Sequence, residues 1–412
     1  MIFLVLKCRF CNEPLNNIFV DLGTSPLSNA FLKKKMLDKL EKKYSLCVYV
    51  CDNCFLVQLP EFEKPENIFE DYAYFSSYSS TWLKHAKNYV SMMIKKFDFD
   101  EKSLVVEIAS NDGYLLQFFK KINIPILGIE PAVNVAKVAK DKGILTITKF
   151  FSENTANELK IEGKSADLII GNNVLAHVPN LNDFVKGLKI LLKPTGMITL
   201  EFPHILQLIQ KNQFDTIYHE HFSYFSLFTA KRILSFYGLT IFNVDEISTH
   251  GGSLRIYVKH AEYDNIPINK KVSILLEKEK QYGLENISTY TNFINNVDVV
   301  KKKLQGFFNQ ARDSGKKVVC YGAAAKGNTL LNYCGIGKKF IDYAVDQNPY
   351  KQGLFLPGTH IPIKDPKEIQ KTKPDYLVII PWNLKEEIME QMKYIRVWGG
   401  KFMIPIPEIE IK

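Results

Sequence analysis

The hydrophobic pattern of the central third of the chain alternates short apolar runs with amphipathic stretches. Strands that alternate with helices build a parallel, doubly wound sheet, and such a sheet binds ligands at the carboxyl ends of its strands. We therefore expect a central α/β domain. The predicted strands are 103–108, 124–129, 166–170 and 197–202, and the predicted helices are 114–119, 135–142 and 181–192, the last closing at a Lys-Pro-Thr-Gly turn.

A second, smaller α/β sheet is predicted near the carboxyl terminus, with strands at 317–322, 340–345 and 376–381. Between the two α/β regions, residues 271–308 are rich in lysine and glutamate and contain no proline, a composition typical of long helices. We therefore predict three domains, with boundaries at 1–68, 69–285 and 286–412.

Four cysteines near the amino terminus form two CxxC pairs, Cys8 with Cys11 and Cys51 with Cys54, separated by 39 residues. Each pair makes a turn that aims two thiolates at one point, and two such turns give the four-sulfur site that structural zinc prefers. A redox pair would explain one CxxC and leave the second unexplained. We predict a zinc-binding module that includes a strand at 44–50.

Composition narrows the function classes. The chain has 412 residues, of which 46% are hydrophobic and 24% charged, as in soluble globular proteins. No apolar run approaches the roughly 18 residues of a membrane helix, and the first residues lack the basic region of a signal peptide. The net charge of +9 comes from scattered lysines rather than a basic stripe. We expect a cytoplasmic protein with neither a membrane nor a nucleic acid as partner.

A cofactor site is predicted where the first two central strands end. Glu107 ends the first strand, the turn Ala-Ser-Asn-Asp-Gly follows at 109–113, and Glu130 ends the second strand, where a carboxylate can accept ribose hydroxyls. A nicotinamide enzyme would share this carboxylate, but the turn has one glycine and no GxGxxG to hold a pyrophosphate. S-adenosylmethionine, which has a ribose and no phosphate, fits better. The predicted cofactor-binding residues are Glu107, Asn111, Asp112, Gly113, Glu130 and Asn173.

Several longer blocks resemble one known family, the three-domain sugar C-methyltransferases that act on nucleotide-linked 4-keto-deoxysugars. The blocks include EIASNDGYLL at 107–116, NNVLAHVP at 172–179, FDTIYHEHFSYFS at 214–226, HGGSLR at 250–255 and YGAAAKGNTLLNYCGI at 321–336. The resemblance implies transfer of a methyl group from S-adenosylmethionine to the carbon beside a ketone, usually C3 of a dTDP-sugar. It also implies that the nucleotide binds mainly through the carboxyl-terminal half and that zinc holds the amino-terminal module.

Such a reaction needs a base to remove the proton beside the ketone and donors near the developing oxyanion. We choose His221 as the base, because a histidine of ordinary pKa is largely neutral at cellular pH. The resemblance adds Glu220, Tyr218, Tyr74 and His177 to the active site. Lys326 and Asn383 are the candidates for binding the substrate, with Lys326 at a strand-to-helix turn where it could face a diphosphate.

Other histidines and acids receive different interpretations. His219 lies two residues from His221, which raises a metal site, but no third ligand is evident nearby and the spacing is not HExxH. We assign His219 a structural or surface role, and His250 a structural role in a tight turn. Asp346 ends a strand as a ribose-binding acid would, which leaves open a second nucleotide site.

Two other functions are compatible with parts of this pattern. An enzyme of the same fold could methylate oxygen or nitrogen, for which no enolising base is needed. A zinc-ribbon protein with a methyltransferase-like core could bind nucleic acid, although the aromatic residues near 71–79 are not interleaved with basic ones. For the quaternary structure we expect a monomer or a weak oligomer.

Overall fold

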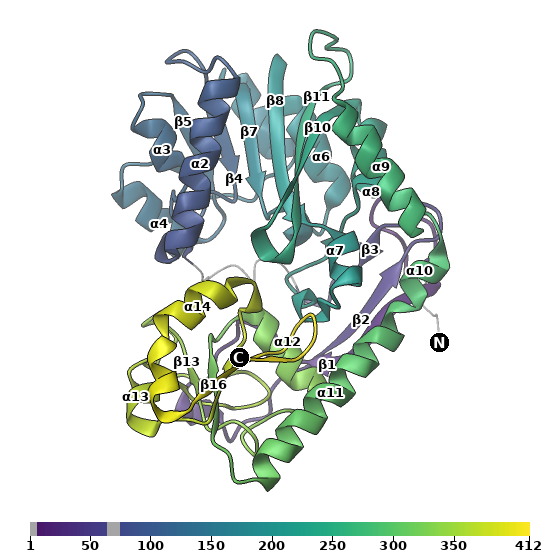
Figure 1. The fold of residues 1–412 in the computed structure, drawn as a ribbon. Coiled ribbons are helices and arrows are strands. Elements are labelled where there is room, and N and C mark those ends of the chain that lie inside the picture. The colour runs from purple at the N-terminus through teal and green to yellow at the C-terminus, as the bar shows by residue number, and fades with distance from the viewer. Residues whose placement is uncertain (1–5, 64–74) are drawn as a thin grey trace.

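The computed structural model describes residues 6–63 and 75–412. Three sheets organise this part of the chain, and Figure 1 shows the largest above the other two. We call the parts built on them the amino-terminal module (four strands), the central domain (seven strands) and the carboxyl-terminal domain (six strands).

The central sheet has the order β10-β11-β8-β7-β4-β5-β6. From β6 to β8 the strands are parallel and follow the doubly wound order. The chain adds β5 and β6 on one side of β4 and then β7 and β8 on the other, so the strand order switches sides between β4 and β7, where such sheets bind ligands. All four predicted strands are confirmed. The bounds are β4 Val105–Ile108, β5 Ile126–Ile129, β6 Thr146–Ile147, β7 Ala166–Asn172, β8 Leu192–Pro203, β10 Leu239–Ile247 and β11 Ser253–His260.

The antiparallel pair β10 and β11 was not predicted. Every residue of β11 is buried, although its sequence SLRIYVKH carries Arg255, Lys259 and His260. These polar residues break the apolar run by which a buried strand is identified. The Lys-Pro-Thr-Gly segment, predicted as a turn, lies inside β8 as a bulge. Ala166 of β7 pairs with Leu192 of β8, and the next pair is Leu168 with Met197, so the residues of the segment have no partners in β7.

Helices cover both faces of the central sheet (Figure 1). One core contains apolar side chains of α2, α3 and α4, and a second core on the opposite face contains those of α5, α6 and α8. The predicted central helices are confirmed within two residues at most ends. The predicted helices are α3, α4 and α6, and the bounds of all the helices of this domain are α2 Ser80–Lys96, α3 Leu116–Lys120, α4 Val133–Asp141, α5 Glu153–Ile161, α6 Leu181–Leu191, α7 Ile205–Gln210 and α8 Leu227–Phe236.

The amino-terminal module is an antiparallel sheet of order β1-β2-β3-β9, formed by Asn17–Ser25, Tyr44–Val50, Val57–Gln58 and Ser223–Tyr224. Its fourth strand comes from the central part of the sequence and begins two residues after the HEH segment, His219-Glu220-His221. Phe19 of β1 stacks on Phe293, the first residue of α11 (Phe293–Asp313), at a ring-centroid distance of 4.8 Å. The module therefore shares its core with the carboxyl-terminal domain and extends the sheet with a strand from the active-site segment.

The carboxyl-terminal domain has the sheet order β14-β13-β12-β15-β16-β17, in which all neighbours except β16 and β17 are parallel. The three predicted strands correspond to β12, β13 and β15. The bounds are β12 Val318–Tyr321, β13 Ala344–Val345, β14 Ile363–Lys364, β15 Tyr376–Ile379, β16 Lys401–Ile404, β17 Glu410–Ile411, α12 Ala325–Cys334, α13 Glu368–Thr372 and α14 Lys385–Gln391.

Two long helices, as predicted, and a short one between them connect the two α/β domains. They are α9 (Lys270–Tyr282), α10 (Ile287–Thr291) and α11 (Phe293–Asp313), which run along one side of the molecule in Figure 1. Within the described ranges, no helix is both long enough and apolar enough to cross a membrane.

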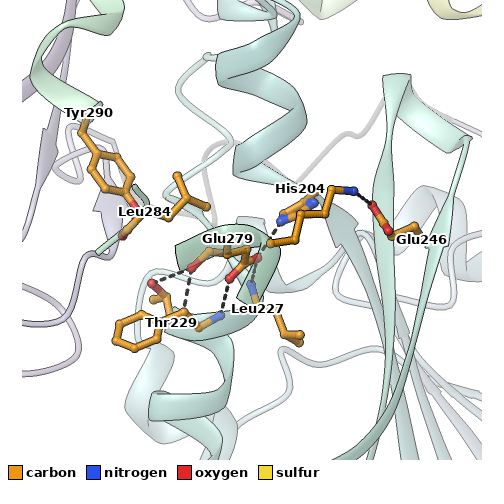
Figure 2. Close-up of polar contacts among 10 residues, drawn as sticks. His204, Leu227, Thr229, Glu246, Glu279, Leu284 and Tyr290 are labelled. Carbon is orange, nitrogen blue, oxygen red and sulfur yellow. Dashed lines mark hydrogen bonds and ion pairs between the residues drawn. The ribbon is translucent and has the colours of Figure 1, made fainter. Parts of the chain in front are cut away.

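A buried carboxylate fixes α9 to the central domain. The side chains of Glu279 and His204 are both 1% exposed, and Glu279 Oε1 accepts a hydrogen bond from His204 Nε2 at 2.7 Å (Figure 2). The Glu279 carboxylate also accepts from the backbone amides of Leu227 and Phe228, at 2.6 and 2.8 Å, in the first turn of α8. One side chain thus satisfies two amide groups at a helix start and one buried imidazole.

We expect Glu279→Ala to lower the free energy of unfolding by about 3 kcal/mol, because it leaves a buried imidazole and two helix amides without an acceptor. The matched control is Lys278→Ala on the same helix, which removes the half-exposed ion pair with Glu246 at 2.8 Å and should cost less than about 1 kcal/mol. Urea denaturation followed by circular dichroism measures both. Equal losses in the two variants would contradict a structural role for the buried pair.

Candidate active site

A cavity of about 570 Å³ lies at the carboxyl ends of the central strands and reaches the carboxyl-terminal domain. Residues from all three parts of the molecule line it. It brings together most of the predicted site residues, namely Asn111, Glu130, Asn173, His177, Tyr218, Glu220, His221, Lys326 and Asn383. Tyr74 lies outside the described residues.

Glu130 is held at the end of β5 by two backbone amides. Its Oε2 accepts from the amide of Asn111 at 3.0 Å, and its Oε1 accepts from the amide of Ala132 at 2.9 Å. Each carboxylate oxygen retains a second acceptor site, so both can still receive a ribose hydroxyl. Burial raises the pKa of Glu130 to about 6, and the two amides partly oppose this by stabilising the charged form.

Asparagine side chains add polar groups to the same part of the cavity. Asn172 is 8% exposed, and neither its Oδ1 nor its Nδ2 has a hydrogen-bond partner among the described residues. Asn111 and Asn173 have φ angles of 50° and 55°, a left-handed conformation that is uncommon outside glycine. Unsatisfied buried polar groups beside the Glu130 carboxylate fit S-adenosylmethionine, which supplies hydroxyl, amino and carboxylate groups to pair with them.

Three predicted cofactor residues lie behind this lining, and their cofactor roles stay predictions. Glu107 is 1% exposed and does not line the cavity, and burial raises its pKa well above the ordinary value. Asp112 pairs with Lys142 at 3.1 Å. Gly113 has a φ of 76°, and a Cβ there would lie 2.8 Å from Ile144 Cγ1, so the turn needs glycine for packing.

The HEH segment forms a turn after the short helix Phe214–Thr216, not an extended strand. His221 Nδ1 lies 2.8 Å from the carbonyl oxygen of Thr216, and a carbonyl can only accept, so Nδ1 carries the proton. His221 Nε2 is then the acceptor, and the hydroxyl of Tyr218 donates to it at 2.9 Å. This places a basic nitrogen inside the cavity.

Burial keeps this imidazole neutral. It lowers the pKa of His221 well below the ordinary histidine value, and the neighbouring His177, whose ring centroid is 4.7 Å away, adds to the effect. The pKa of His177 itself falls to about 4, again mainly through burial. Both imidazoles can therefore accept a proton over the whole neutral range.

Glu220 faces the cavity and accepts a hydrogen bond from Asn29 Nδ2 at 2.6 Å. Asn29 belongs to the amino-terminal module and also lines the cavity, and we had not identified it from the sequence. Asn29 lies 191 residues before Glu220, so no local sequence pattern could indicate that the two residues meet. Only the fold could have revealed this contact.

His219 points to the other side of the turn. Its Nε2 donates to the carbonyl of Ser45 in β2 at 3.1 Å, and the residue is 4% exposed. The turn therefore separates the two histidines that strand alternation would have placed on one face. His219 has a structural position between the central domain and the amino-terminal module.

The carboxyl-terminal domain supplies Lys326 and Asn383 to the cavity wall. His250 also lines the cavity, although we had assigned it only to a tight turn. The turn is present, since His250 has a φ of 53° and Gly251 and Gly252 have φ of 90° and 128°. Burial lowers the pKa of His250 to about 3. Adjacent glycines predicted the turn but gave no sign of the direction of the imidazole.

The four predicted zinc ligands form one cluster. The sulfur atoms of Cys8, Cys11, Cys51 and Cys54 all lie within 4.8 Å of one another, with Cys8 to Cys54 and Cys11 to Cys51 both at 3.5 Å. Four thiolates converging on one point suit a tetrahedral zinc ion. Gln58 Nε2 donates to Cys8 Sγ at 3.2 Å and helps to orient it.

Cys54→Ser should remove zinc from the purified protein, because a hydroxyl is a poor replacement for one of four thiolates. Cys47→Ser is the control, since Cys47 is buried in β2 and lies outside the cluster. Inductively coupled plasma mass spectrometry should find one zinc per chain in the wild type and in the control. A full equivalent of zinc in the Cys54 variant would contradict the four-cysteine site.

The raised pKa of Glu130 predicts how cofactor affinity depends on pH. As pH falls through about 6 the carboxylate is protonated and loses an acceptor, so the Kd of S-adenosylhomocysteine should rise about tenfold between pH 8 and pH 5. Glu130→Gln should bind more weakly at pH 8 and show no such change. Isothermal titration calorimetry measures both, and an unchanged pH dependence in the variant would assign it to another group.

Comparison with known proteins agrees with this arrangement. Three family models match in order: a zinc binding domain at residues 8–69, a methyltransferase domain at 82–244 and a C-methyltransferase C-terminal domain at 248–407. The C-methyltransferase NovU of Streptomyces niveus is 33% identical over 402 residues, covering 98% of this chain and 96% of that protein.

More distant similarities are confined to part of the chain. A ubiquinone biosynthesis O-methyltransferase of Rhodopseudomonas palustris is 28% identical over 116 residues, covering 26% of this chain and 45% of that protein. Among solved structures, magnesium protoporphyrin IX methyltransferase from Synechocystis with bound S-adenosylmethionine has 15% identity and a TM-score of 0.33, covering 43% of this chain and 78% of that one. The near full-length similarity to NovU and the three matching domains show that the chain belongs to the family of three-domain, S-adenosylmethionine-dependent C-methyltransferases.

Proposed function

We propose that this C-methyltransferase acts on a nucleotide-linked 4-keto-deoxysugar and methylates the carbon beside the ketone, C3 of a dTDP-sugar. The observation that carries the proposal is the buried, neutral His221 of the cavity wall, whose Nδ1–H is fixed to Thr216 and whose Nε2 accepts from the Tyr218 hydroxyl. Methylation of a carbon requires that its proton be removed first, and ketones acidify the neighbouring carbon. An enzyme that methylates oxygen or nitrogen does not have to remove a proton from carbon.

His221 Nε2 takes the proton from the carbon beside the ketone, directly or through the hydroxyl of Tyr218 that donates to it. The bond between Nδ1 and the Thr216 carbonyl keeps the tautomer correct and stabilises the imidazolium that forms. S-adenosylmethionine, when bound, supplies the methyl group. The residues around Glu130 would hold its ribose beside the sugar.

The other active-site residues position the sugar. Glu220, anchored by Asn29, can accept a hydrogen bond from a sugar hydroxyl. We assign His177 and Tyr74 to the sugar as well, Tyr74 on the family resemblance alone. Asn383 and the backbone at Ala324 and Ala325, where α12 begins, line the part of the cavity formed by the carboxyl-terminal domain. The amides at a helix start favour an anion, so we assign the nucleotide diphosphate to this end.

The test is incubation with S-adenosylmethionine and a panel of nucleotide 4-ketosugars, followed by mass spectrometry and NMR of the product. We expect one added methyl on a carbon of one member of the panel. Methylation of an oxygen or a nitrogen would reject the enolisation chemistry, and no product from any member would reject the substrate class.

His221→Gln should lower kcat by about 100- to 10,000-fold, because it removes the general base. The same variant should lose exchange of the sugar proton beside the ketone with deuterium in heavy water. The control is His219→Gln, two residues away, in which the amide can still donate to Ser45 and activity should persist. Normal proton exchange in the His221 variant would assign the base to another group.

A further inference from the structure

The ammonium group of Lys326 is buried in the cavity wall without a hydrogen-bond acceptor. Lys326 lies in the first turn of α12, and its Nζ has no partner among residues 6–63 and 75–412. Nζ lies 4.8 Å from the centroid of the Trp382 ring, so an aromatic face covers one side of the charge. A buried cation without an acceptor is costly, and functional sites are where such costs persist.

The carboxylate of Asp215, which is hydrogen-bonded to Trp382, favours the charged form of this lysine. Asp215 is 1% exposed, and its Oδ2 accepts from Trp382 Nε1 at 2.6 Å. Burial lowers the pKa of Lys326, and the charge of Asp215 opposes this change. The carboxylate makes no direct ion pair with Lys326 within the described part of the chain, so the N–H groups of this cavity-lining lysine have no acceptor there.

The helix that carries Lys326 is fastened to the segment that orients the base. Thr329 Oγ1, one turn along α12, donates to the carbonyl of Ile217 at 2.8 Å, and the preceding carbonyl, that of Thr216, accepts from His221 Nδ1. At Gly327 a Cβ would lie 2.4 Å from Ile380 Cγ2, so the backbone of α12 packs closely against Ile380. These contacts fix Lys326 on the same side of the cavity as His221. In agreement, the charge of Lys326 contributes to the lowered pKa of His221 and of His250.

The second lysine of the cavity has a different environment. Lys351 Nζ donates to the carbonyl of Ala323 at 2.8 Å and lies 3.6 Å from Asp346, so existing acceptors already compensate it. A diphosphate spreads two negative charges over several oxygens and suits exposed amides and solvated cations. The surroundings of Lys326, a tryptophan face and neutral imidazoles, suit one oxygen whose charge develops during the reaction.

We propose that Lys326 faces the ketone oxygen of the substrate, not its diphosphate, and stabilises the enolate oxygen as His221 removes the neighbouring proton. The inference rests on the proposed function. In this step the C–H bond breaks and its proton moves to His221 Nε2. The electron pair of that bond forms a carbon–carbon double bond, and the π pair of the carbonyl moves onto the oxygen, where the ammonium group of Lys326 pairs with it. Lys326 is then a catalytic residue.

The test compares Lys326→Met with Lys339→Met, an exposed lysine of the same domain whose Nζ also lies 4.8 Å from a ring centroid, that of Phe340. Three quantities are measured: kcat with the ketosugar that the wild type methylates, deuterium exchange at the carbon beside the ketone without S-adenosylmethionine, and the Kd of dTDP. We expect Lys326→Met to lower kcat and exchange by about 100- to 1,000-fold and to change the Kd of dTDP by less than about threefold. Lys339→Met should match the wild type.

A tenfold weaker dTDP affinity with wild-type exchange would overturn the inference and assign Lys326 to the diphosphate. Wild-type values in all three measurements would overturn it as well. If Lys326→Met fails to fold by circular dichroism, Lys326→Arg decides instead: it keeps the charge and should retain more exchange than Lys326→Gln, and equal exchange in these two variants would contradict the role. Failure of the proposed function can be distinguished from failure of this inference, because in the first case the wild type itself would methylate no ketosugar.

Discussion

Segment 216–224 forms hydrogen bonds to all three parts of the molecule, and the position of His221 depends on them. The amide of Phe222 donates to Ala176 of the central domain at 2.7 Å, and Thr329 of the carboxyl-terminal domain donates to Ile217 at 2.8 Å. Asn29 of the amino-terminal module donates to Glu220, and β9 adds a strand to that module's sheet. The active site therefore exists only when the three parts are docked, since each supplies both wall residues and a restraint on the turn.

Burial is the second physical factor in this site. It holds the imidazoles of His177, His221 and His250 in the neutral form, and it leaves the Lys326 ammonium group without a nearby acceptor. In a cavity of low dielectric, a fixed cation acts strongly on a charge that develops beside it, whereas water would screen the same interaction. Neutral bases beside one buried cation are suited to enolisation, in which a proton leaves carbon and negative charge appears on oxygen.

The amino-terminal module, which holds the four clustered cysteines, is connected to this site through packing as well as through Asn29. The knuckle of Cys51 and Cys54 is bound to α8, because Thr229 Oγ1 donates to the Cys54 carbonyl at 3.2 Å and Arg232 to the Asn53 carbonyl at 2.6 Å. The start of α8 is in turn capped by Glu279 of α9 (Figure 2). The cysteine knuckle thus packs on α8 at the Asn17 end of β1, whereas Asn29 follows the Ser25 end of the same strand.

The sequence alone predicted the zinc ligands, the alternating central strands and the presence of Glu220 and His221 in the cavity. Local signals suffice for these features: CxxC spacing, apolar runs and turn residues act over a few positions. The antiparallel pair β10 and β11, the contact of Asn29 with Glu220 and the environment of Lys326 were decided by tertiary structure. Each depends on residues distant in sequence, and burial, which sets the pKa of His221 and leaves Lys326 without an acceptor, is a property of the packed molecule and not of any local pattern.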